Sequence, residues 1–144
     1  MGAYLGIDID SPGVQTHLTT LQSIIGRLST LGGGVKMLAA TVVGLVAVLG
    51  DGDWGTAGAL AGFVLVLWGL DGYYLAKERS FRHAYNCFVY DLQSEQVLAR
   101  DLFRIEKPVL KTVDWVKATL SPSVWIFYSA IIILTFAVIG AWGC

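Results

Sequence analysis

Three stretches of the chain are apolar for long enough to cross a lipid bilayer. They cover residues 35–50, 55–76 and 124–143. A membrane-spanning helix needs about 20 predominantly apolar residues, with a lower limit near 17. The second and third stretches meet this length, and the first reaches it with a further turn from the glycines before it. The pattern therefore predicts an all-α integral membrane protein with three transmembrane helices.

A helix with one apolar stripe is predicted over residues 11–31, before the first span. Ser11 and Pro12 are typical of a helix start, because proline is tolerated at the first helical position. A stripe at spacings of four and three is either a coiled-coil seam against a second copy or the face of a helix that lies on lipid or protein. Residues 32–34 are all glycine, which predicts a break or hinge before the first span. The stripe consists of Val14, Leu18, Leu21, Ile25 and Leu28.

The chain between the second and third spans is predicted to be helical as well. The helix of the second span should continue to about Tyr90, because apolar residues keep helical spacing beyond Ala76. The sequence "DLQSEQ" then indicates a turn, and a second amphipathic helix follows over 97–117 with an interruption near Pro108. No internal repeat divides the chain, so we expect a single membrane domain over residues 1–144.

Composition and charge agree with a lipid environment. Charged residues make up 15% of the chain and the mean hydropathy is +0.62, whereas a soluble domain carries about a quarter charged residues. All 10 Lys and Arg residues lie before the first span, at its start, or between the second and third spans. The positive-inside rule then places the N-terminus and residues 77–121 in the cytoplasm and the C-terminus outside.

Glycine residues form one face of the second span. Helices in lipid associate largely through close van der Waals contact along small residues, so this face is predicted to pack against another helix. Its partner is either the first span of the same chain, which offers Gly44, or another subunit, and the two are compatible. Three short spans do not enclose an aqueous path alone, so a pore requires several copies. The face consists of Gly55, Gly58, Gly62, Gly69 and Gly72.

Asp71 is an acid inside the second span. It lies about 9 Å before the first base, Lys77, at a rise of about 1.5 Å per residue. An unpaired carboxylate at that depth costs about 2–3 kcal/mol. Either Asp71 bonds a tyrosine hydroxyl or a base one turn on, such as Lys77 or Arg79, or it faces the helix bundle. In the second case an oligomer carries an acidic ring at the cytoplasmic mouth of a pore, which favours cations.

The residues around Asp71 belong to the same candidate pore or gate. Gly69 and Gly72 permit bending or close packing beside the acid, and Tyr73 and Tyr74 are either interfacial anchors or gate residues. The sequence "KERSFRHAYNCF" then interleaves bases with aromatic residues. Such a cluster either binds phosphates and stacks nucleobases or holds anionic lipid headgroups. Its bases are Lys77, Arg79, Arg82 and His83.

Signs of enzyme chemistry are absent from the sequence. It contains no HExxH motif, no nucleophile elbow and no P-loop. His17 and His83 have no companions at metal-ligand spacing, and Cys87 and Cys144 are far apart. We therefore expect no catalytic residue, no metal and no cofactor.

A resemblance to a known group of proteins rests on three stretches, "LDGYYLAKERSFRHAYNCFV" at 70–89, "DLF" at 101–103 and "SVWIFY" at 123–128. The first is similar to the pattern L-D-x-Y-Y-L-x-x-E-R-x-F-R-x-x-Y-N-x-F of small bacterial inner-membrane proteins found in antiphage defence loci. The chain most resembles the Hailong-type membrane effectors. The similarity extends over about residues 18–127 and carries no catalytic motif.

The resemblance implies a self-associating channel, expected to be a homotetramer in the bacterial inner membrane. A partner nucleotidyltransferase would control it with a nucleotide or nucleic-acid signal, in Hailong systems a single-stranded deoxyadenylate oligomer. Opening would collapse the membrane potential and halt the infected host cell. The resemblance also adds Arg100 and Arg104 to the candidate ligands of the anionic signal. The alternative is a non-conducting membrane scaffold that recruits a cytoplasmic partner through residues 77–121.

Overall fold

Helices make up nearly all of the computed structural model, which describes residues 11–49, 53–94 and 109–142. Within these ranges there is no strand, so the all-α prediction is confirmed. The helices are α1 (Pro12–Leu49), α2 (Trp54–Gln93), α3 (Thr112–Thr119) and α4 (Pro122–Trp142).

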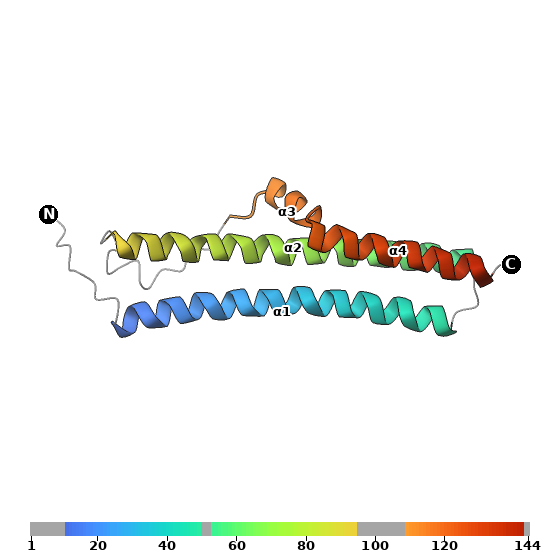
Figure 1. Ribbon diagram of the computed structural model, residues 1–144, viewed down its shortest axis with the longest axis horizontal. Coiled ribbons are helices and arrows are strands. Elements are labelled where there is room, and N and C mark those ends of the chain that lie inside the picture. The colour runs from blue at the N-terminus through green and yellow to red at the C-terminus, as the bar shows by residue number, and fades with distance from the viewer. Residues whose placement is uncertain (1–10, 50–52, 95–108, 143–144) are drawn as a thin grey trace.

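Two long helices set the shape of the molecule. α1 and α2 run antiparallel along its whole length, and α4 lies beside the half in which α1 ends and α2 begins (Figure 1). The short α3 packs on α2 near its middle, and α3 and α4 are bent relative to each other by 56°. The molecule therefore has a three-helix half, formed by α4 with residues 35–49 and 54–76, and a two-helix half, formed by residues 12–31 and 77–93.

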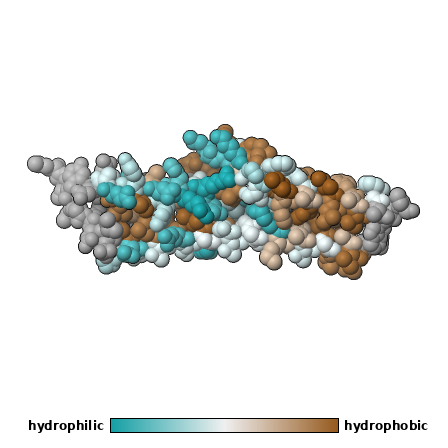
Figure 2. Space-filling model, in the orientation of Figure 1, coloured by the Kyte–Doolittle hydropathy of each residue, from teal (hydrophilic) through white to brown (hydrophobic). Residues whose placement is uncertain are grey.

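The three-helix half contains the hydrophobic core. Its outward surface is apolar as well, with Leu65 and Ile133 exposed by 52% and 68%, as expected of helices surrounded by lipid. Figure 2 shows apolar side chains over this half and most of the polar ones over α3 and the two-helix half. The core consists of Val35, Ala39, Val43, Leu60, Val64, Leu67, Val124, Tyr128 and Ile131.

The described chain contains two helices, α1 and α2, that are each long and apolar enough to span a membrane, and α3 with α4 form a third, bent candidate. The 38 residues of α1 extend for about 57 Å, well beyond a hydrocarbon core of about 30 Å. If they span a membrane, both long helices therefore project out of it. The predicted continuation of the second span past Ala76 is confirmed, because α2 ends at Gln93.

The predicted break at residues 32–34 is wrong, because α1 runs through them without interruption. Each glycine costs about 1 kcal/mol relative to alanine inside a helix, but packing along α2 outweighs that cost. Gly32 is buried, and a Cβ atom there would lie 3.1 Å from Oδ1 of Asp71. This glycine provides a close approach between two helices and not a hinge.

The apolar stripe of residues 11–31 packs on α2 of the same chain. Val14 and Leu21 are buried, and the rings of His17 and Phe88 lie 4.3 Å apart between centroids. Of the alternatives for this stripe, contact with protein is therefore the one observed, and the protein is α2 of the same chain.

The structure tests only the last part of the amphipathic helix predicted over 97–117. Residues 97–108 lie outside the described ranges, and residues 109–111 are not helical, which agrees with the interruption predicted near Pro108. The helix that follows, α3, has eight residues. Helices of this length are marginal in isolation, so α3 depends on its contacts with α2.

Candidate functional site

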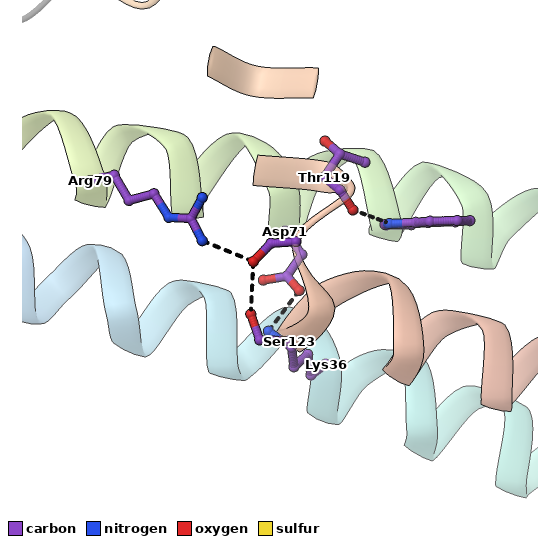
Figure 3. Close-up of polar contacts among 7 residues, drawn as sticks. Lys36, Asp71, Arg79, Thr119 and Ser123 are labelled. Atoms are coloured by element: carbon purple, nitrogen blue, oxygen red, sulfur yellow. Dashed lines mark hydrogen bonds and ion pairs between the residues drawn. The ribbon is translucent and has the colours of Figure 1, made fainter. Parts of the chain in front are cut away.

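Polar side chains converge where the two halves of the molecule meet (Figure 3). Asp71 of α2 is only 1% exposed, and its Oδ2 pairs with Nζ of Lys36 from α1 at 2.7 Å. A buried charge needs a counter-charge, because transfer of an isolated carboxylate from water is very unfavourable. Asp71 therefore faces the helix bundle, and the prediction that a base one turn further along α2 neutralises it is wrong.

Two residues of α1 make room for this carboxylate and hold it. Gly32 and Lys36 are four residues apart, so they lie on the same face of the helix. Gly32 has no side chain between α1 and Asp71. Lys36 is 30% exposed, so the methylene stem of its side chain covers apolar surface while the ammonium group reaches the acid.

α3 is fixed to α2 immediately beside Asp71. Trp68 Nε1 donates to the carbonyl oxygen of Thr119 at 2.9 Å, and Trp115 Nε1 donates to the carbonyl oxygen of Gly69 at 3.0 Å. A Cβ atom on Gly72 would lie 2.9 Å from Cα of Thr119, which leaves no room for a side chain. Close packing at Gly69 and Gly72, one of the two roles predicted for them, is therefore what the structure shows.

Arg79 forms a hydrogen bond with the turn between α3 and α4 and does not pair with Asp71. Its Nη2 donates to Oγ of Ser121 at 2.8 Å, and the hydroxyl oxygens of Ser121 and Ser123 are 3.5 Å apart. Ser121 is 9% exposed. This hydrogen bond adds a second connection between α2 and the chain that leads into α4.

Tyr128 brings α4 to the same site. Its side chain is fully buried and stacks on Trp68, with 6.1 Å between the ring centroids. The hydroxyl group interacts with the carboxylate of Asp71. α1 and α4 therefore each place a polar side chain next to the carboxylate that α2 carries.

Lys36 and Tyr128 are not among the site residues predicted from the sequence. One signal was present, because Lys36 is the only base inside the apolar stretch 35–50. An acid and a base buried in two neighbouring spans are natural partners. Tyr128 carries no comparable signal, since aromatic residues are common near the ends of spans.

The tyrosine pair after Asp71 divides between surface and core. Tyr73 is 38% exposed, and Nζ of Lys77 lies 5.2 Å from the centroid of its ring. Tyr74 packs against the hydrophobic core. An exposed tyrosine beside a lysine at the end of an apolar stretch favours the interfacial-anchor interpretation over a gate.

The glycine face of the second span is open over its first turns. Gly58 and Gly62 are exposed, and a Cβ atom on either would have no described atom within 4 Å, which is also true of Gly44. The prediction that these glycines pack against the first span of the same chain is wrong, because larger apolar side chains fill the space between α1 and α2. The buried face of this part of α2 consists of Ala57, Leu60, Val64, Leu67 and Asp71.

The basic residues proposed to receive an anion fall into separate places. Arg82 pairs with Glu78 on its own helix at 2.7 Å. Arg79 and His83 line a cleft of about 280 Å³ between α2 and α3. Arg100 and Arg104 lie outside the described residues.

The chemistry available at the Asp71 site is that of one ion pair and a few hydroxyl groups. Across residues 11–49, 53–94 and 109–142, no group of three His, Cys, Asp or Glu side chains is placed to hold a metal ion. Comparison with protein-family models, curated proteins and solved structures finds no match to this chain.

Proposed function

We propose that this chain is one subunit of an oligomeric ion channel in the bacterial inner membrane, and that an anionic signal on the cytoplasmic side controls it. The observation that carries the proposal is the Lys36–Asp71 pair, which is buried among helices able to span a membrane. Ionisable residues in such helices are costly, and they mark ion or proton pathways. Stability alone does not explain the pair, because apolar residues of similar volume often replace a buried ion pair without loss.

A single subunit does not enclose a path for ions, because its core is filled by apolar side chains. The proposed pore therefore lies between copies. The open glycines Gly44, Gly58 and Gly62 offer a surface for close approach of a helix from another subunit. A tetramer is the assembly that the resemblance to Hailong-type effectors implies.

The proposed topology puts the two-helix half in the cytoplasm and the end of α4 outside. The distribution of all Lys and Arg residues supports it through the positive-inside rule. The first turn of α1 and the last turn of α4 also lie towards opposite ends of the long axis (Figure 1). A chain that crosses the membrane three times requires this separation of its ends.

The proposed role of Asp71 depends on whether it is paired with Lys36. In the described arrangement Lys36 neutralises it, and it lies on the buried face of α2 while Gly58 and Gly62 lie on an exposed one. The pair therefore stabilises a non-conducting arrangement. Its separation would free an acid for a ring at the mouth of the pore, where carboxylates favour cations.

The defence role rests on the resemblance described above. The signal would be a single-stranded oligodeoxynucleotide made by a partner nucleotidyltransferase. Opening of the channel would depolarise the cell and arrest its growth, which would stop phage propagation.

The test is potassium flux from liposomes that contain the purified full-length protein. Lys36→Met and Asp71→Asn both break the pair and should raise the flux in the absence of any signal. Lys77→Met removes a charge outside the pair and serves as the matched control. Liposomes that remain equally tight with the wild-type protein and all three variants would rule out the channel.

A membrane scaffold is the second candidate. One observation favours it, because α1 and α2 continue as a pair beyond the three-helix half and carry polar side chains there (Figure 2). In that case Asp71→Asn has no effect on function, whereas charge reversal at Arg79 and Arg82 abolishes co-purification with the product of a neighbouring gene.

A further inference from the structure

A second polar site lies where α3 crosses α2, in the cleft of about 280 Å³. The α2 residues at this cleft follow spacings of three and four, so they form one face of that helix. The two α3 residues are three apart and also share a face. The cleft is lined by Ala76, Arg79, Ser80, His83, Asp114 and Lys117.

Among the described residues, no carboxylate forms an ion pair with the positive charges of this cleft. The one side-chain partner of Arg79 in the described chain is the neutral hydroxyl of Ser121. Lys117 forms neither an ion pair nor a hydrogen bond through its side chain within the described ranges, and Asp114 forms no ion pair there. Arg82, by contrast, is paired with Glu78. Two cations thus face one acid, and the described lining of the cleft carries net positive charge.

We infer that this cleft binds the phosphate group of a small phosphate ester. The guanidinium group of Arg79 presents five N–H donors in a planar fork that matches phosphate oxygens, so donors remain after its bond to Ser121. Lys117 adds a second cation, and Ser80 adds a hydroxyl donor. The carboxylate of Asp114 favours an ester that carries a hydroxyl or amino donor beside the phosphate. Nucleotides and phospholipid headgroups share this chemistry.

The cleft is also connected to the Lys36–Asp71 site. Arg79 lines the cleft and bonds Ser121, at the turn from which α4 begins. A phosphate that repositions Arg79 would change the contact between α2 and that turn. This consequence for the channel rests on the proposed function, whereas binding of the phosphate does not.

The experiment measures binding by calorimetry, with the full-length protein in phosphatidylcholine nanodiscs and inorganic pyrophosphate as the probe. Saturable binding is expected. Lys117→Gln and Arg79→Gln should each weaken it by about tenfold or more, the usual effect of removing a charged hydrogen-bond donor. Lys77→Gln removes the same charge on α2 outside the cleft and should change the affinity by less than about twofold. No saturable binding, or equal losses for Lys77→Gln and Lys117→Gln, would overturn the inference.

A second arm identifies the source of the phosphate. The titration is repeated in nanodiscs of equal parts phosphatidylcholine and phosphatidylglycerol. If a lipid headgroup occupies the cleft, phosphatidylglycerol weakens pyrophosphate binding and Lys117→Gln removes that difference. If affinity is unchanged, the cleft binds a soluble ester. Because no ion flux is measured, failure to bind refutes the cleft alone, and tight liposomes refute the channel alone.

Discussion

Replacing Lys36 with methionine leaves Asp71 buried without its counter-charge. The side chain of Asp71 is 2% exposed and that of Lys36 is 30% exposed, so the carboxylate is cut off from water, whereas part of the lysine side chain is not. Breaking a buried ion pair by removing one partner costs about 3–5 kcal/mol. Because the pair is partly exposed, the value should lie at the lower end of this energy range. We therefore expect Lys36→Met to lower the free energy of unfolding by about 3 kcal/mol. That is about a hundredfold in the equilibrium constant.

Replacing the acid instead of the base should lower the free energy of unfolding by less. Asp71→Asn keeps a hydrogen-bond acceptor next to Lys36 and lets the ammonium group turn towards water, so about 1 kcal/mol should be lost. The double variant buries no unpaired charge. It should be about 2 kcal/mol less stable than the wild type, and the coupling energy between the two positions should therefore be about 2 kcal/mol.

Unfolding by sodium dodecyl sulfate in mixed micelles measures these free energies, and tryptophan fluorescence reports on the site because Trp68 hydrogen-bonds Thr119 there. Lys77→Met is the control, since Lys77 forms no ion pair in the described chain. It should change the stability by less than about 0.5 kcal/mol. The reasoning is refuted if Asp71→Asn costs as much as Lys36→Met, or if the two losses simply add in the double variant.

Two further predictions concern the glycines of α2. Gly72→Ala places a Cβ atom 2.9 Å from Cα of Thr119, so it should displace α3 and lower the free energy of unfolding by about 1–3 kcal/mol. A shift in tryptophan emission would report the displacement. Gly58→Ala is the control at an open position, and equal effects of the two substitutions would contradict the packing described. Gly58→Leu combined with Gly62→Leu should leave the unfolding free energy within about 0.5 kcal/mol of the wild type. Under the proposed function, this double variant should abolish chemical crosslinking between copies in membranes. Unchanged crosslinking would exclude this face as the subunit interface.

The sequence predicts the type and approximate position of the long helices. The apolar periodicity from Gly55 to Leu92 identifies α2 almost from end to end, because a strong helical pattern depends on local spacing alone. The run of glycines at 32–34 misleads for the same reason. A local rule predicts a break there, whereas contact with a distant segment keeps the helix continuous.

The site is predictable only in part. Asp71 can be identified from the sequence because an acid is energetically unfavourable inside an apolar segment. Its partner cannot, because the antiparallel pairing of two helices brings Lys36 and Asp71 together. The sequence also does not predict which neighbour the glycine face of α2 meets. Spacing shows that Gly58 and Gly62 share a face, but which face of α2 meets α1 depends on how leucine and valine side chains fill the space between the helices.

The continuity of α1 and α2 has a mechanical consequence. Each is a single rod that runs from the two-helix half into the three-helix half, with no flexible joint in which a displacement could dissipate. A molecule that binds the ends of α1 and α2 in the two-helix half would therefore transmit rotation or tilt directly to their apolar segments in the three-helix half. Insertion of one residue into such a rod would turn everything beyond it by about 100°, whereas insertion of seven would nearly restore its phase.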